Sequence, residues 1–296
     1  MLMLVMMLGT VATLSSCGGD DDNTPTNQSG DDSGSTTGGG TTGGTTNAVD
    51  VAIYAFTDAA ADYVSLELTE DSRYIIERNV SVSKTPQQGA DPKATCFAPA
   101  LRQDLSRASY YESKIVEGKF TKSNGKYILE GFGTATIVVV DKIATVTITE
   151  NGKREQVLKA TMTIPTGKES DFTTKLCHTW KITKIVNKYT DESFSFTPEE
   201  FAKVNEGFAP AYVTISKVGT YLVTDIQGDS EMAHWRWDNE AEGIMQYSWD
   251  YDATGTNWNS REAGFTTVAF EGETIVVTED FVDEHYTSIA YCTRVK

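Results

Sequence analysis

Alternating apolar and polar residues dominate residues 48–165 and predict β-strands there. Tyr63–Leu68 alternates in this way, and apolar side chains return at Tyr74–Ile76 after a polar turn. Asn124-Gly125 and Asn151-Gly152 each lie between two strand-like runs, and Asn-Gly is the strongest short signal for a β-hairpin. We therefore expect an antiparallel β domain over residues 48–165.

The strand pattern stops over the stretch Val80–Ser109. This stretch contains Pro86, Pro92 and Pro99, and it favours at most a short helix near Leu101–Arg107. Proline has no backbone N–H to donate, so it is rare inside a paired strand. We expect one long connecting loop within the first domain.

A second antiparallel β domain is predicted for residues 171–296. Turn-forming residues at 165–170 separate it from the first domain, and all five tryptophans lie between Trp180 and Trp258. The apolar pattern indicates strands at His178–Val186, Tyr212–Ser216, Tyr221–Asp225, Ala233–Asp238, Ile244–Asp250, Phe265–Phe270, Thr274–Thr278 and Ser288–Val295.

One short helix is expected among these strands. Thr197 is a favoured N-cap, Pro198 suits the first helical position, and Glu199 and Glu200 place negative charge in the first turn. Gly207 is a typical stop. The expected fold class is therefore all-β, with two antiparallel β domains and one short helix in the second.

The chain begins with an apolar run that has the length of a signal-peptide core. Leu2–Leu14 is thirteen residues long, which is too short to cross a bilayer as a helix. It ends in Leu14-Ser15-Ser16-Cys17, which resembles the lipobox of bacterial lipoproteins. The resemblance implies that residues 1–16 are a removed signal peptide and that Cys17 carries fatty-acyl chains such as palmitate, which anchor the protein in a membrane. An ordinary secretory signal with a chance cysteine is the alternative.

Residues 17–47 are predicted to form a disordered tether. After Cys17 they contain only Gly, Thr, Ser, Asp, Asn, Gln and one Pro, so they bury too little apolar surface to offset the entropy of ordering. Asp20–Asp22 is similar to the surface-export signal of Bacteroidetes lipoproteins. That similarity implies a lipid-anchored protein of the outer membrane, exposed at the cell surface; a plain acidic linker is the alternative.

Negative charge is concentrated in the second domain. The chain has a net charge of −17, and residues 171–296 contribute 10 basic and 21 acidic groups, a net of −11. Such a surface repels phosphate backbones, so nucleic acid is excluded as an expected partner. The acidity serves solubility or binds cations.

Few residue patterns point to catalysis or to metal binding. The sequence contains no nucleophile elbow, phosphate-binding loop or zinc-ligand spacing. His285 lies near Asp280, Asp283 and Glu284, but acidic residues in a loop are usually just solvated. We expect a protein that is not an enzyme and has no catalytic residues, cofactor or metal.

A stripe of aromatic residues is the most informative candidate for a ligand site. A strand places Met245, Tyr247, Trp249 and Tyr251 on one face, and the preceding strand places Trp235 and Trp237 on one face. Aromatic rings fill cores, and Tyr and Trp also carry polar tips suited to ligands. Both interpretations stay open. The candidate ligand-binding residues are Trp235, Trp237, Tyr247, Trp249 and Tyr251.

The order of several short motifs in the second domain resembles the lipocalin-like domains of Bacteroidetes lipoproteins. The motifs are Leu176-Cys177-His178-Thr179-Trp180, Gly219-Thr220-Tyr221, Trp235 with Trp237, and Ile275-Val276-Val277. The resemblance implies an eight-stranded up-and-down barrel over residues 171–296, which holds one small ligand or is filled by side chains. It also implies that Arg294 covers Trp180 in a structural contact.

Closure of such a barrel pairs its first and last strands. Cys177 opens the first strand and Cys292 lies near the end of the last, so we expect a disulfide between them. Cys96 would then remain free. The alternative is that each of the three is a lone buried thiol.

Two function classes remain. The first is a binding protein whose C-terminal barrel captures a small apolar molecule or a glycan. The second is a non-catalytic structural or interaction protein with a filled barrel, acting as an adhesin or as an accessory subunit that contacts another envelope protein. An apolar cavity of roughly 300 Å³ or more inside the second domain would favour the first.

Overall fold

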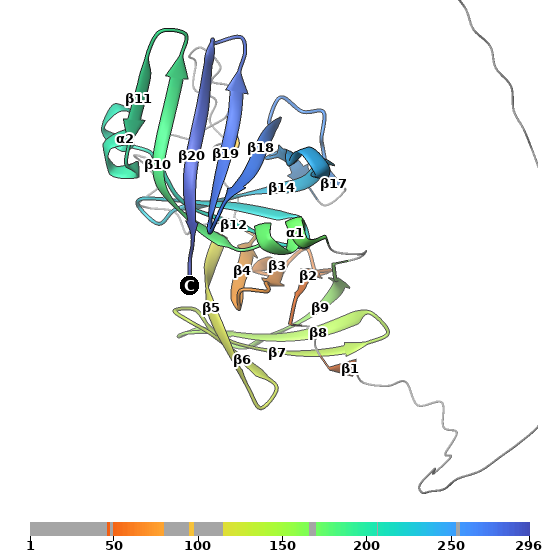
Figure 1. Ribbon diagram of the computed structural model, residues 1–296. Coiled ribbons are helices and arrows are strands. Elements are labelled where there is room, and N and C mark those ends of the chain that lie inside the picture. The colour runs from red at the N-terminus through yellow and green to blue at the C-terminus, as the bar shows by residue number, and fades with distance from the viewer. Residues whose placement is uncertain are drawn as a thin grey trace, which may run out of the picture. The chain divides into compact units, whose positions relative to one another are not determined.

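The computed structural model of the chain describes residues 46–47, 50–79, 95–97, 115–165, 170–205, 207–252 and 255–296 (Figure 1). The expected signal peptide, Cys17, the tether up to residue 45 and the helix expected near residues 101–107 lie outside these residues. Gly43–Lys296 forms one compact unit. Within the described residues, no helix has the length and the apolar character that a membrane-spanning helix needs.

The first β domain is a closed antiparallel barrel of eight strands, which we call barrel one. Each strand pairs with the next along the chain, and the last pairs back with the first. Its strands are β2 (Ala52–Phe56), β3 (Tyr63–Leu68), β4 (Arg73–Arg78), β5 (Ile115–Ser123), β6 (Lys126–Leu129), β7 (Gly133–Val140), β8 (Ile143–Glu150) and β9 (Gln156–Thr163).

The end of the predicted tether is ordered. Thr46–Asn47 forms the short strand β1, which pairs with Val138 and Val139 of β7. The tether was expected to continue through residue 47, so this is a correction of its boundary. The short strand β6 pairs only with the first residues of β7, up to Thr136. The edge of β7 beyond Thr136 is therefore open to β1.

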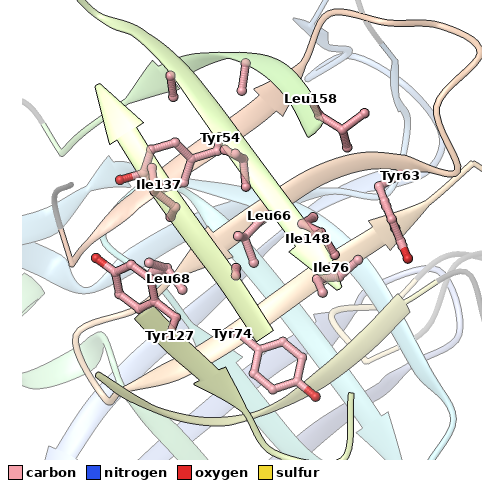
Figure 2. Packing of buried hydrophobic residues seen from close by; sticks show 14 of the residues in the cluster. Tyr54, Tyr63, Leu66, Leu68, Tyr74, Ile76, Tyr127, Ile137, Ile148 and Leu158 are labelled. Carbon is pink, nitrogen blue, oxygen red and sulfur yellow. The ribbon is translucent and has the colours of Figure 1, made fainter. Parts of the chain in front are cut away.

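Barrel one is filled by its own side chains. Alternate residues of each strand point inward, and Figure 2 shows Tyr54, Leu66, Ile76 and Ile148 directed toward one another. The ring of Tyr74 passes over Gly118, where a Cβ would lie 2.8 Å from its Cε1 atom. Gly118 therefore makes room for this ring.

The second β domain is also a closed antiparallel barrel of eight strands, barrel two. Its first and last strands pair from Trp180 opposite Arg294 to Tyr189 opposite Tyr286, which confirms the expected closure. Its strands are β10 (Thr179–Tyr189), β12 (Pro210–Ile215), β13 (Thr220–Asp225), β14 (Ser230–Asn239), β15 (Ile244–Ser248), β18 (Ala263–Glu271), β19 (Thr274–Phe281) and β20 (Tyr286–Arg294). Three short strands, β11 (Ser193–Phe196), β16 (Tyr251–Asp252) and β17 (Gly255–Thr256), lie outside the ring.

The expected helix is present as α2 (Pro198–Val204). The Thr197 side chain accepts the Glu200 N–H, and the Glu200 side chain accepts the Thr197 N–H, which completes a capping box. A further helix, α1 (Asp171–Leu176), was not predicted. Its N-cap is Ser170, which the sequence pattern assigned to a turn. A single helical turn, η2 (Glu240–Glu242), precedes β15.

Both barrels enter their third strand in the same way. Ser72 precedes β4 and Gly219 precedes β13, and both have a positive φ, of 56° and 100° respectively. The Ser72 carbonyl accepts the Phe120 N–H at 2.8 Å, and the Gly219 carbonyl accepts the Trp235 N–H at 2.8 Å. The two barrels therefore share both their strand order and this turn.

The barrels differ in the connection that follows the third strand. In barrel two, β13 ends at Asp225 and β14 begins at Ser230. In barrel one, β4 ends at Arg78 and β5 begins only at Ile115. The long loop predicted from the sequence is thus the connection between β4 and β5, and residues 95–97 are its described part.

Candidate ligand site inside the second barrel

The interior of barrel two is mainly apolar and contains the carboxyl group of Glu279. On β19, Ile275 and Val277 point into the barrel core, and the two-residue period of a strand turns Glu279 to the same side. Glu279 is only 6% exposed. A buried carboxyl group is costly unless it is hydrogen-bonded, so its partners define the site.

Tyr247 is the first partner of Glu279. Its hydroxyl donates to Oε1 of Glu279 at 2.5 Å. Tyr247 lies on β15, and its ring crosses the intervening strand β18 at Gly264, where a Cβ would come within 2.7 Å of Cζ of the ring. The absence of a side chain at Gly264 therefore allows Tyr247 to reach Glu279.

The second partner comes from barrel one. The backbone N–H of Cys96 donates to Oε2 of Glu279 at 2.8 Å, in a buried hydrogen bond. The indole N–H of Trp249 donates to the carbonyl of Thr95 at 2.9 Å. Cys96 is fully buried, Phe97 is 8% exposed, and both belong to the core of barrel two. The connection between β4 and β5 thus contributes residues to the interior of the other barrel.

Hydroxyl and thiol groups complete the polar part of the site. The Tyr221 hydroxyl on β13 is buried and makes no hydrogen bond of ordinary geometry among the described residues. The Cys96 thiol, a weak donor and acceptor, is a neighbour of this hydroxyl. This arrangement leaves the Tyr221 hydroxyl without a strong partner.

Burial sets the protonation of these groups. Burial and the neighbouring Glu279 raise the pKa of the Tyr247 phenol and the pKa of the Cys96 thiol. Burial and the nearby Cys96 raise the pKa of Tyr221. All three groups are therefore protonated at neutral pH, and Glu279 is surrounded by donors.

The aromatic stripe expected from the sequence does not form a single wall. Trp235 is 7% exposed, belongs to the core and donates its indole N–H to the Ser216 carbonyl at 2.9 Å. The Trp237 ring packs edge-on against Phe172 of α1, with ring centroids 5.2 Å apart. Trp235 also lies opposite Tyr247 in the register of β14 and β15 and packs edge-on against Trp237, with ring centroids 5.3 Å apart. Of the five residues, Tyr247 and Trp249 are the two that surround the inserted Thr95–Cys96 segment.

Tyr251 lies away from this site because the strand ends early. The alternation predicted a strand through Asp250, but β15 ends at Ser248 and Tyr251 belongs to β16. Its ring lies 4.5 Å from that of His234, and its hydroxyl points to Glu77 of barrel one at 3.5 Å. Tyr251 therefore contacts barrel one.

Trp180 and Arg294 lie at the end of barrel two next to barrel one. They are opposite each other in the register of β10 and β20. Trp180 is 2% exposed and donates its indole N–H to the Leu176 carbonyl at 2.8 Å. The Arg294 guanidinium lies 3.6 Å from Asp71 of barrel one, whose carboxylate also contacts His178 at 2.7 Å.

The expected disulfide between Cys177 and Cys292 is not formed in this structure. Both residues, like Cys96, are buried and take part in no disulfide. The register places Cys292 opposite Ile182, whereas Cys177 precedes the strand as the C-cap of α1. Both residues also belong to the core of barrel two.

Two parts of the site were not anticipated from the sequence. Ile275, Val277 and Glu279 alternate along the sequence and so share one face of their strand. A carboxyl group at a position where this pattern otherwise has apolar residues was the signal that could have revealed the site. Residues 95–97 lie in a stretch without periodicity and carried no such signal. Among the described residues, no group of three or more His, Cys, Asp or Glu side chains is arranged to hold a metal ion.

The site and the fold define a two-barrel, all-β protein with a carboxylate inside its second barrel. No protein-family model matches the chain, and no curated protein or solved structure matches it either.

Proposed function

We propose that this chain is a lipid-anchored binding protein whose second barrel holds a small molecule with an apolar body. The observation that carries the proposal is Glu279, a carboxylate buried among the apolar residues of a barrel interior. A barrel that needed only to be filled would be more stable with an apolar residue there, since isolated buried polar groups cost free energy.

The surroundings of Glu279 have the composition of a ligand site. Small-molecule sites are mainly apolar and aromatic, with a few polar groups that orient the ligand. Here Trp249 and Val277 supply apolar surface, and Glu279, Tyr247 and Tyr221 supply the polar groups. A small apolar molecule with one N–H or O–H group suits this set best, and a glycan is the other ligand class we retain.

Location is part of the same proposal. The Leu14–Cys17 motif supports acylation of Cys17, and Asp20–Asp22 supports display on the outer face of the outer membrane. A lipid anchor makes the membrane the first partner of the protein. From there, the barrels would face ligands outside the cell, and the protein would have no enzymatic activity, metal or cofactor.

A second candidate is an interaction protein with a filled barrel. The observation that favours it is a row of aromatic rings in contact at one end of barrel two. Phe281 and Tyr286 stack with centroids 4.5 Å apart, Tyr286 and Tyr189 stack at 5.4 Å, and Tyr189 meets Phe194 edge-on at 6.0 Å. Tyr189 and Phe194 are each 45% exposed. An adhesin or accessory subunit of an envelope complex would use such rings to contact its partner.

Titration with N-phenyl-1-naphthylamine separates the two candidates. This fluorescent probe combines an apolar aromatic body with one N–H donor, and the non-acylated Cys17→Ala chain avoids competition from lipid. All five tryptophans lie between Trp180 and Trp258, so energy transfer from tryptophan to the probe reports binding at barrel two. We expect saturable transfer for the unaltered barrel.

Two variants make the titration specific. Glu279→Gln replaces one carboxyl oxygen by an amide NH2 group, which cannot accept a hydrogen bond, and should weaken binding by about tenfold. Glu271→Gln removes a carboxylate from the exposed end of β18 and should leave binding unchanged. Absence of saturable transfer would favour the interaction protein, and equal affinities in both variants would remove Glu279 from the site.

A further inference from the structure

We propose that Thr95–Phe97 is an internal ligand of barrel two, and that the site recognises a secondary amide joined to an aromatic group, as in a short peptide. This inference rests on the proposed function and specifies its ligand class. It also assigns to barrel one a role in controlling access to the site.

Both hydrogen bonds to the inserted segment converge on one peptide group. The Thr95 carbonyl and the Cys96 N–H are the two polar ends of the peptide bond between these residues. Trp249 donates to the carbonyl at 2.9 Å, and Glu279 accepts from the N–H at 2.8 Å. The barrel thus presents a donor on one side of an amide and an acceptor on the other.

An aromatic ring accompanies this amide. Phe97 is 8% exposed and belongs to the same core as Trp180, Tyr221 and Tyr247. The two backbone hydrogen bonds do not depend on the identity of the side chains at 95 and 96. A separate molecule with an amide and a suitably placed aromatic ring would therefore make the same contacts.

The architecture sets this segment apart from the rest of the core. The equivalent connection of barrel two spans only residues 226–229, whereas that of barrel one spans residues 79–114. A barrel of this kind therefore closes without a long connection at this position. The extra length brings Thr95–Phe97 to Glu279 and Trp249, whose hydrogen bonds to this segment span 183 and 154 positions of the sequence.

Displacement of Thr95–Phe97 leaves several polar groups of the site without their present partners, and a ligand can take these places. Glu279 loses its backbone donor and Trp249 loses its acceptor. The Tyr221 hydroxyl loses the adjacent Cys96 thiol. Because buried polar groups must be paired, a molecule that carries an amide and an apolar body pairs best with the vacated groups and excludes water.

Site-specific alkylation tests the insertion. Cys96, Cys177 and Cys292 are all fully buried, so each should react slowly with N-ethylmaleimide, and mass spectrometry of the digested chain follows them separately. Phe97→Ala should accelerate the reaction of Cys96 by about tenfold or more and leave Cys177 and Cys292 unchanged. If Cys96 in the unaltered chain reacts as fast as in denatured protein, the insertion does not occur and the inference is wrong.

A peptide tests the ligand class. Acetyl-Thr-Ala-Phe-amide should bind Phe97→Ala about tenfold more tightly than the unaltered chain, because the internal competitor is weakened. In the unaltered chain, the peptide should expose Cys96 saturably and leave the other two thiols protected. The same peptide with an N-methylated alanine lacks the N–H that would donate to Glu279. It should neither bind Phe97→Ala more tightly nor expose Cys96 in the unaltered chain.

The outcomes separate this inference from the proposed function. Binding of N-phenyl-1-naphthylamine without any effect of the peptide on Cys96 would overturn the internal ligand and leave the binding function standing. Failure of both molecules to bind would overturn both. If Phe97→Ala exposes all three thiols, the barrel itself has opened. Trp249→Phe, which removes the indole N–H and keeps a smaller aromatic ring, is then tested in place of Phe97→Ala under the same criteria.

Discussion

The backbone N–H of Cys96 donates a hydrogen bond to the buried carboxylate of Glu279 at 2.8 Å, although the two residues are 183 positions apart. The contact joins a connection of barrel one to the interior of barrel two. Since it satisfies a buried carboxylate, it couples the packing of barrel two to the position of residues 95–97.

The hydroxyl of Tyr247 should be important for stability. It is a partner of Glu279 inside the barrel, so Tyr247→Phe leaves the carboxylate with fewer donors. We expect a loss of about 1–3 kcal/mol in the free energy of unfolding, measured by urea denaturation. Tyr189→Phe, at a ring that is 45% exposed, is the matched control and should change stability little. Equal effects of the two substitutions would contradict the importance of the bond to Glu279.

Stability should fall as the pH rises from about 4.5 to about 7. Glu67 is 3% exposed and accepts the Thr220 hydroxyl at 2.6 Å, and burial raises its pKa from 4.5 to about 7. Burial also raises the pKa of Glu70 to about 7. In this window Glu67 and Glu70 hold more protons in the folded protein than in the unfolded chain, so these two groups make stability decrease as the pH rises.

Glu67→Gln tests the assignment of this pH dependence. The substitution removes one of the two titrating groups, so the unfolding free energy should lose on the order of 2–3 kcal/mol of its change between pH 4.5 and pH 7.5. Urea denaturation across this range measures it. Glu199→Gln, at an exposed residue of α2, should keep the full dependence. If the unfolding free energy of Glu67→Gln changes with pH as much as that of the unaltered chain, the raised pKa does not belong to this residue.

Replacement of Cys17, the proposed site of acylation, should release the protein from membranes. The Leu14–Cys17 motif supports Cys17 as the attachment point, and a lipid anchor with two or more chains holds a protein stably. We expect Cys17→Ala to appear in the soluble fraction after cell lysis, whereas Ser16→Ala stays with the membranes. Sedimentation of Cys17→Ala with the membranes would indicate another form of attachment.

Proteinase K applied to intact cells should report which way the protein faces. The tether has no Lys or Arg, since Arg73 is the first basic residue of the chain, so trypsin does not cut it and a less selective protease is needed. We expect intact cells to shed a fragment that contains both barrels. Cleavage only after permeabilisation of the outer membrane would place the protein on the periplasmic side.

Strands and the fold class were predictable because they depend on local alternation. The strand predicted at Tyr63–Leu68 is β3, whereas closure of barrel two was expected only from the resemblance to lipocalin-like domains. The helix at Pro198 was predictable because its capping signals are adjacent in sequence. These elements required no information from distant residues.

The candidate site was less predictable because it depends on distant contacts. Aromatic residues continue the alternation past Ser248, so the pattern did not reveal that Trp249 leaves the strand to contact Thr95. Nothing near Cys96 in the sequence signals a partner at Glu279. A two-residue period also cannot give the register of β10 and β20, so it did not show that Cys177 and Cys292 lie apart.

Amide hydrogen exchange at Cys96 tests the central claim most directly, since that claim is that a ligand binds where Thr95–Phe97 now lies. The Cys96 N–H is buried and bonded to Glu279, so a peptic fragment covering residues 95–97 should exchange slowly in the free protein. Saturation with N-phenyl-1-naphthylamine should accelerate exchange in this fragment and slow it in β15 and β19. Continued protection of residues 95–97 while the probe is bound would place the ligand elsewhere and contradict the account.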